Sequence, residues 1–190
     1  MILEIKVDEG FATMLAAIIA ALLSLFTLLA VKPAEMRSAN RQALEPYIHD
    51  ISDSIHQIVA TSTILLKNKS ETSRLNWTNK ASNAKEKLKE IRPKTRYSLW
   101  GLEKYLLSLT RLPDYTLYTL EDINVANKVV KRGGQFGNKI DKCVRQCYIK
   151  GRAPRFYDLW ILAYYNWRFK KVRNDYKSKR LNKYQLNDIK

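Results

Sequence analysis

FATMLAAIIAALLSLFTLLAV, residues 11–31, is a run of 21 residues without a charged side chain. An α-helix rises 1.5 Å per residue, so this run is long enough to cross the roughly 30 Å hydrocarbon core of a bilayer. The competing interpretation is a cleaved signal peptide, which begins with a basic segment and has a shorter apolar stretch of about 7–15 residues. The segment before this run is acidic instead: Glu4, Asp8 and Glu9 outnumber Lys6. The sequence therefore predicts a transmembrane helix.

The positive charges beside this run predict its orientation, because Lys and Arg flanks are retained on the cytoplasmic side. Only Lys6 precedes the run, whereas three cations follow it closely: Lys32, Arg37 and Arg41. We therefore expect a single-pass protein of the inner (cell) membrane. Residues 1–10 would form a short extracytoplasmic N-terminus, and residues 32–180 a cytoplasmic domain.

The chain after the apolar run is strongly basic. Residues 32–190 hold 33 of the 34 Lys and Arg but 15 of the 18 Asp and Glu, a net charge of +18. This charge indicates an acidic partner such as nucleic acid, anionic lipid headgroups or an acidic protein. Cys143 and Cys147 are expected to remain thiols in a reducing compartment, and with no His nearby they do not form a zinc site.

The sequence after Pro33 predicts an all-α fold, a small helical bundle behind the membrane helix, because apolar positions recur at helical spacing and strand-like alternation is rare. Pro93, Pro113 and the pair Gly133-Gly134 are expected to end helices. The expected helices are residues 46–67, 73–91, 97–112, 121–131, 138–150 and 155–179. Residues 181–190 are expected to be a frayed tail.

The last of these helices changes character along its length. Its second half is almost wholly basic, which indicates exposure to solvent. Its first half is almost wholly apolar, so we expect these side chains in the core: Phe156, Leu159, Trp160, Ala163 and Trp167.

Small and hydroxylated residues follow a regular spacing within the membrane helix. They recur at intervals of 3, 4, 3, 4 and 3 residues, a heptad pattern that places them on one face: Gly10, Thr13, Ala17, Ala20, Ser24 and Thr27. We call this set the small-residue seam. In lipid, helices associate through close backbone approach at small residues and through interhelical hydrogen bonds. The seam therefore predicts self-association, and a ring of such helices would line a narrow, weakly polar pore.

Few residues point to catalysis or metal binding. His49, Asp53 and His56 share a helix face, but three candidate ligands on one helix without a known signature favour a solvated polar face over a metal site. No nucleophile–base pair or acid–base dyad is recognisable, which disfavours an enzyme. We expect no cofactor.

Basic residues are densest between residues 128 and 155, where Asp141 is the single acid. Such a field attracts polyanions, and nearby aromatic rings offer stacking platforms for bases. RNA and anionic lipid are both open as ligands. The candidate binding residues, here called the basic face, are Lys131, Arg132, Lys139, Lys142, Arg145, Lys150, Arg152 and Arg155.

The turn Gly151-Arg152-Ala153-Pro154-Arg155-Phe156-Tyr157 is similar to the Arg-x4–6-His motif of HEPN domains, small helical folds that often act as ribonucleases. Arg152 matches the motif arginine, while Tyr157 replaces the histidine. Tyrosine, with a pKa near 10, is a poor base at neutral pH, so the replacement puts RNA cleavage in doubt.

A single membrane helix followed by a basic, degenerate HEPN-like domain resembles the membrane accessory proteins of type VI-B CRISPR loci. This resemblance implies a homo-oligomeric membrane pore that supports RNA-guided antiviral defence by depolarising the membrane, with a CRISPR effector nuclease as partner. The leading hypothesis is thus a self-assembling pore. The alternatives are a membrane-tethered module that binds RNA or an acidic partner and, more weakly, a divergent ribonuclease that uses Arg152.

Overall fold

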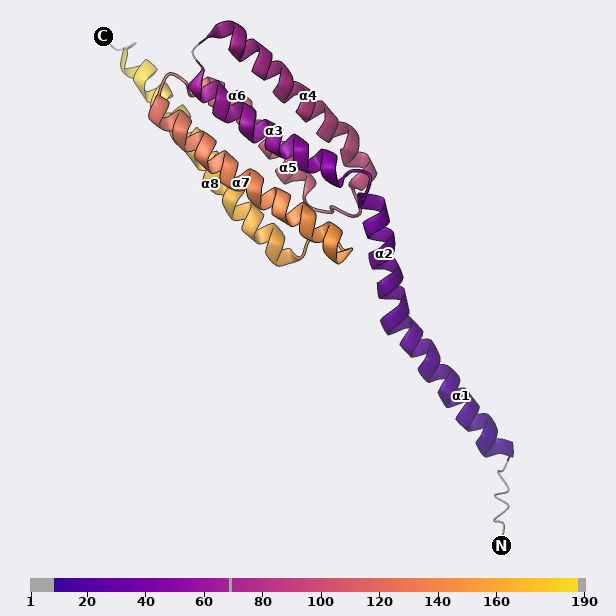
Figure 1. Cartoon of the computed structure of the whole chain (residues 1–190). Coiled ribbons are helices and arrows are strands. Elements are labelled where there is room, and N and C mark those ends of the chain that lie inside the picture. Colours follow the sequence, from indigo (N-terminus) through magenta and orange to yellow (C-terminus); the bar gives the residue numbers. More distant parts are fainter. Residues whose placement is uncertain (1–8, 69, 188–190) are drawn as a thin grey trace.

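The computed structural model describes residues 9–68 and 70–187, and within these ranges the chain is helical with no strand (Figure 1). This confirms the all-α prediction of an N-terminal apolar helix followed by a helical bundle. In chain order the elements are α1 (Glu9–Phe26), the π-helical turn η1 (Thr27–Val31), α2 (Lys32–Leu44), α3 (Ile48–Lys67), α4 (Glu71–Thr95), α5 (Glu103–Leu109), α6 (Leu112–Tyr118), α7 (Ile123–Lys150) and α8 (Phe156–Asn187).

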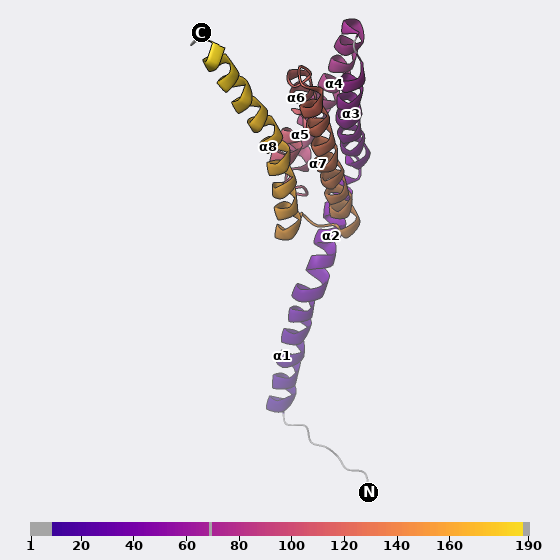
Figure 2. The ribbon, with the colours of Figure 1, turned by 90° about the vertical axis from the view of Figure 1, so that its left-hand side faces the viewer.

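The first three elements form one continuous helix, Gly10–Leu44, that projects from the bundle as a rod (Figures 1 and 2). It is long and apolar enough to cross a membrane, and none of its most apolar window is buried within the chain. Pro33 lies inside this continuous helix, just after the π-helical turn η1, and it removes one backbone N–H donor there. The predicted N-terminal segment, residues 1–10, lies mostly outside the described residues.

The bundle is organised around α7, which packs against α3, α8, α6, α2 and α5, while α4 packs on α3. Three aromatic rings fill its centre. Phe136 of α7 stacks on Phe169 of α8 with ring centroids 6.0 Å apart, and Tyr105 of α5 meets Phe136 edge-on at 6.3 Å. Burying such rings is among the largest apolar contributions available to a domain of this size. The predicted helix 46–67 corresponds closely to α3, whose apolar stripe faces this core.

The prediction that Gly133-Gly134 ends a helix is wrong. Helix α7 runs unbroken through Gly133, Gly134 and Gly137, so the two predicted helices 121–131 and 138–150 are one. Gly133 and Gly137 are buried where α7 crosses α6 and α3: a Cβ at Gly133 would clash with Leu112, and one at Gly137 would lie 2.8 Å from Val59 Cγ2. The glycines serve close helix packing, which offsets their low helix propensity.

The region between α4 and α7 also differs from prediction. Pro93 does not break α4, which continues to Thr95 with the proline in its last turn. The predicted helix 97–112 is instead a set of turns followed by α5 and α6. Gly101 interrupts it with a φ of +80°, a left-handed conformation that glycine adopts readily. Pro113 lies in the first turn of α6 rather than ending a helix, because its missing N–H is harmless there.

The apolar half of α8 is only partly buried, which corrects the expectation that it lies in the core. Leu162 and Phe169 are buried and Leu159 and Ala163 pack partly against the core. The large rings point outward, with exposed fractions of 83% for Phe156, 70% for Trp160 and 56% for Trp167. Both faces of this half are apolar, so the residue pattern could not show which one packs inward.

Helix α8 leaves the bundle in its second half (Figure 2) and continues to Asn187. The predicted frayed tail, residues 181–190, is therefore helical up to that residue. Residues 188–190 lie outside the described part of the chain.

Candidate functional site

The basic face is built largely by one helix. Because α7 is continuous, six of its eight predicted residues share that helix: Lys131, Arg132, Lys139, Lys142, Arg145 and Lys150. At 3.6 residues per turn they span an arc of roughly 140°. Arg152 and Arg155 follow in the turn to α8. None of the eight is buried: Arg132, Lys139 and Arg152 are partly exposed and the others are exposed, so they form an accessible stripe along α7 and the turn that follows it.

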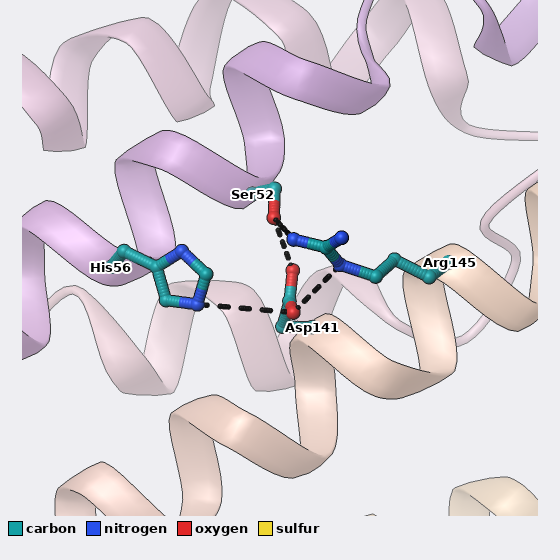
Figure 3. Close-up of polar contacts among 4 residues, drawn as sticks. All are labelled: Ser52, His56, Asp141 and Arg145. Carbon is teal, nitrogen blue, oxygen red and sulfur yellow. Dashed lines mark hydrogen bonds and ion pairs between the residues drawn. The ribbon is translucent and has the colours of Figure 1, made fainter.

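A polar cluster joins this stripe to α3 (Figure 3). Asp141, whose side chain is 12% exposed, accepts hydrogen bonds from Ser52 Oγ and from Arg145 Nε, the latter at 2.9 Å. Arg145 Nη2 donates to Ser52 Oγ at 2.7 Å, which closes a ring of three hydrogen bonds. His56 Nε2 lies 3.8 Å from Asp141 Oδ2, within ion-pairing distance when the imidazole is protonated.

The geometry of the polar cluster argues against nucleophilic catalysis. Ser52 is buried, and its hydroxyl donates to the carboxylate of Asp141 rather than to His56. A serine nucleophile requires a base within hydrogen-bonding reach and access to substrate. The cluster instead joins α3 to α7 and holds the guanidinium of Arg145, whose side chain remains 55% exposed, in a fixed position on the basic face.

Sequence reasoning missed this cluster. It treated Arg145 as a binding residue of the basic face and His56 as part of a solvated polar face shared with His49 and Asp53. The signal that was present is Asp141, a single acid within a long basic stretch. Among the described residues no group of three or more His, Cys, Asp or Glu side chains is placed to hold a metal ion.

The motif residues Arg152 and Tyr157 do not line a common hollow. Arg152 borders a small depression with Cys147, Lys150 and Asp158. Tyr157 borders a different and larger groove on α8.

That larger groove combines aromatic rings with a cation. It has a volume of about 670 Å³, and its polar lining includes Lys139 of α7. The exposed rings beside it repeat along the outer face of α8 and are here called the aromatic stripe: Phe156, Tyr157, Trp160, Tyr164 and Trp167. Two cations stack on these rings, Lys171 at 5.3 Å from the Trp167 centroid and Arg168 at 5.5 Å from that of Tyr164. Sequence reasoning did not identify the stripe, because it expected Phe156, Trp160 and Trp167 to be buried in the core.

The two cysteines form a buried pair one turn apart on α7. The Cys147 thiol donates a hydrogen bond to Cys143, which raises the pKa of Cys147, and burial raises it further. The same bond lowers the pKa of Cys143. Both are free thiols, as predicted.

The small-residue seam lies on the projecting rod. Gly10, Thr13, Ala17, Ala20 and Ser24 belong to α1, and Thr27 begins the π-helical turn. All six positions are exposed. Thr27 Oγ1 donates to the carbonyl oxygen of Leu23 at 2.9 Å, which satisfies this hydroxyl within its own helix.

Comparison with family models, with curated proteins and with solved structures finds no match to this chain.

Proposed function

We propose that this protein is a single-pass protein of the cell membrane that self-associates through α1 and forms a pore or channel-type effector, with its basic bundle in the cytoplasm. The observation that carries the proposal is the rod Gly10–Leu44, whose apolar part is covered by no other segment of the described chain. Exposing such a surface to water is unfavourable, roughly 25 cal/mol for each Å² of apolar area. A bilayer and neighbouring helices would cover this apolar surface and remove it from water.

The seam supports assembly of several copies. Small side chains at heptad spacing let helix backbones approach closely, which is the main source of attraction between helices in lipid. A ring closed through this face would turn the weakly polar side chains of Thr13, Ser24 and Thr27 toward its axis. Such a lining fits a narrow pore that opens and closes by wetting.

The resemblance to membrane accessory proteins of type VI-B CRISPR loci extends this proposal to a role. In that role the pore depolarises the membrane during antiviral defence and works with a CRISPR effector nuclease. Support for this part comes from the motif around Arg152 and from the order of a membrane helix before a basic helical domain.

The test is the mass of the detergent-solubilised particle together with dye release from vesicles. Replacing Ala17 and Ala20 by Leu should prevent close approach, yielding monomers and abolishing dye release. Replacing Leu15 and Leu22 by Phe adds bulk to the opposite face and serves as the control, which should leave both readouts unchanged. An A17L/A20L protein with unaltered mass and dye release would refute assembly through the seam.

A second candidate function is a tethered RNA-binding module, favoured by the basic face lying beside the aromatic stripe. Charge reversal at Lys131 and Lys142 should weaken RNA binding and reduce the salt dependence by about one unit of slope for each lost phosphate contact. Arg145 is unsuitable for this test because it also holds the polar cluster. Reversal at Lys80 and Lys85 on α4 is the control, and absence of binding at low salt would exclude this function.

A further inference from the structure

The end of the bundle nearest the rod contacts α2 at one defined position along the rod. The backbone of Gly151, in the α7–α8 turn, contacts that of Arg37, and Asn40 Nδ2 donates to the carbonyl oxygen of Gly151 at 3.3 Å. Ser98, in the turn after α4, donates to Asn40 Oδ1 at 3.4 Å. Figure 2 shows the α7–α8 turn beside α2. Two turns of the bundle are thereby fixed against the same stretch of the rod.

When the apolar run spans a bilayer, this position on α2 lies near the bilayer surface. Arg37 follows Val31, the last residue of the apolar run, by six residues, which is about 9 Å along a helix. The polar headgroup layer extends roughly 5–7 Å beyond the hydrocarbon core on each side. The bundle end therefore lies close enough for side chains to reach the headgroups. This step rests on the proposed membrane insertion of α1.

Large apolar side chains are exposed at this end. They come from the turn after α4, the end of α7 and the start of α8, and we call them the bundle base: Tyr97, Trp100, Ile149, Phe156, Tyr157 and Trp160. Tyr97 and Trp100 flank Ser98, and a Cβ at Gly101 would lie 2.9 Å from Leu159 Cδ1, so the turn after α4 adjoins the start of α8. Ile149 is two residues from Gly151. The base is thus one continuous region.

The charges around the bundle base are mostly positive. Exposed or partly exposed cations accompany the aromatic rings: Lys32, Arg37, Arg41, Lys94, Arg96, Lys150, Arg152 and Arg155. Among nearby acids, Asp158 accepts a hydrogen bond from the backbone N–H of Arg155, and Glu103 forms an ion pair with Arg92. Trp and Tyr prefer the level of lipid headgroups, and Lys and Arg are attracted to anionic ones.

We propose that the bundle base is an interfacial lipid-binding surface that seats the bundle on the anionic leaflet of the membrane. The rings of Trp100, Phe156 and Trp160 enter the headgroup layer, and Arg152 and Arg155 contact lipid phosphates. The contact holds the bundle at a fixed orientation to the rod, so it sets how neighbouring bundles meet around the small-residue seam.

The experiment uses the full chain reconstituted in vesicles and the fluorescence of its tryptophans. One variant, W77F/W167F, retains Trp100 and Trp160 of the base. The matched control, W100F/W160F/W167F, retains Trp77, which lies in the second turn of α4, more than four turns from the end that adjoins α2. Vesicles of phosphatidylcholine, with or without phosphatidylglycerol, carry a spin label at the lipid headgroup. Circular dichroism checks that each variant folds.

With phosphatidylglycerol present, the base tryptophans should lose most of their fluorescence to the headgroup label and shift to the blue, while Trp77 is unaffected. In the background of the first variant, R152Q/R155Q should lessen the dependence on the anionic lipid. Flotation with the vesicles tests membrane insertion separately, so a chain that does not float refutes the proposed function. A chain that floats but whose base tryptophans are not quenched refutes the proposed lipid-binding surface and leaves the proposed function standing. Quenching of these tryptophans by added RNA, but not by labelled lipid, would refute the same proposal.

Discussion

Gly151 lies in the turn between α7 and α8, and its Cα lies directly against the backbone carbonyl of Arg37 in α2. A Cβ at Gly151 would clash with the carbonyl oxygen and lie 2.8 Å from the carbonyl carbon. Gly151 also has a φ of +60° and ends α7 as a left-handed C-cap. Glycine is thus required twice at this position, once for its conformation and once for the close approach of the bundle to the rod.

Replacing Gly151 by Ala should lower the free energy of unfolding of the bundle by about 2 kcal/mol or more. The left-handed conformation alone costs roughly 1–2 kcal/mol for a residue with a Cβ. The clash adds to this, because a backbone carbonyl cannot rotate away as a side chain does. Urea unfolding followed by circular dichroism in detergent measures the change, and a G151A protein as stable as the parent would contradict the close contact.

Adjacent glycines in α7 should respond to alanine with opposite signs. A Cβ at Gly133 would clash with Leu112, which is fully buried, so G133A should destabilise the fold by about 1–3 kcal/mol. A Cβ at Gly134 would make an ordinary contact, 3.6 Å from Val59 Cγ1, so G134A should stabilise the helix by about 0.5–1 kcal/mol. Thermal unfolding of both variants gives the comparison. Equal effects of the same sign would mean that α7 does not cross α6 at Gly133.

These glycines also show where sequence reasoning fails. Two consecutive glycines are a helix stop in most contexts. Only the packing of α7 against Leu112, which is buried, and Val59, which is partly buried, explains why the helix continues. Those neighbours are distant in sequence, so no local pattern records them. The apolar helix α1 and the helix α3 were predictable because their apolar residues form a run or a stripe that can be identified within one helix.

The candidate site was predictable only in part, for the same reason. The basic face follows from local charge density, and each of its residues is exposed or partly exposed. The polar cluster joins Ser52 to Asp141, 89 residues apart, and depends on how α3 crosses α7. Three rings of the aromatic stripe, Phe156, Trp160 and Trp167, were assigned to the core because both faces of early α8 are apolar. Tertiary packing selected the face with Leu162 and Phe169.

Removing the guanidinium of Arg145 should destabilise the bundle by about 1.5–3 kcal/mol, the range for hydrogen bonds to charged groups. In R145A the carboxylate of Asp141 keeps Ser52 as a donor but loses its hydrogen-bonded cation. Lysine should not restore stability, because its ammonium lacks the planar fork that bonds both Asp141 and Ser52.

Urea unfolding of R145A, R145K, D141A and the double variant R145A/D141A tests this role. The double variant should lose less stability than the sum of the single losses, because the two residues share one network. K142A, an exposed cation on the same helix, is the control and should change stability by less than about 0.5 kcal/mol. Additive losses would show that the ion pair contributes nothing.

The two thiols should differ in their reaction with iodoacetamide, because the thiolate is the reactive form. The hydrogen bond from Cys147 lowers the pKa of Cys143, so Cys143 has more thiolate near neutral pH. The same bond and burial raise the pKa of Cys147, so its thiol stays protonated. Cys143 also borders a hollow of about 230 Å³ between α7 and α8.

Mass spectrometry of the folded protein should therefore find alkylation at Cys143 first, accelerating as the pH rises from about 7 to 8. Cys147 should remain unmodified over that range and react only after unfolding in urea. In C143A the bond that raises the pKa of Cys147 is absent while burial remains, so Cys147 should react faster than in the parent yet slower than in the unfolded chain. Equal rates at the two cysteines of the folded parent would refute the hydrogen-bonded pair.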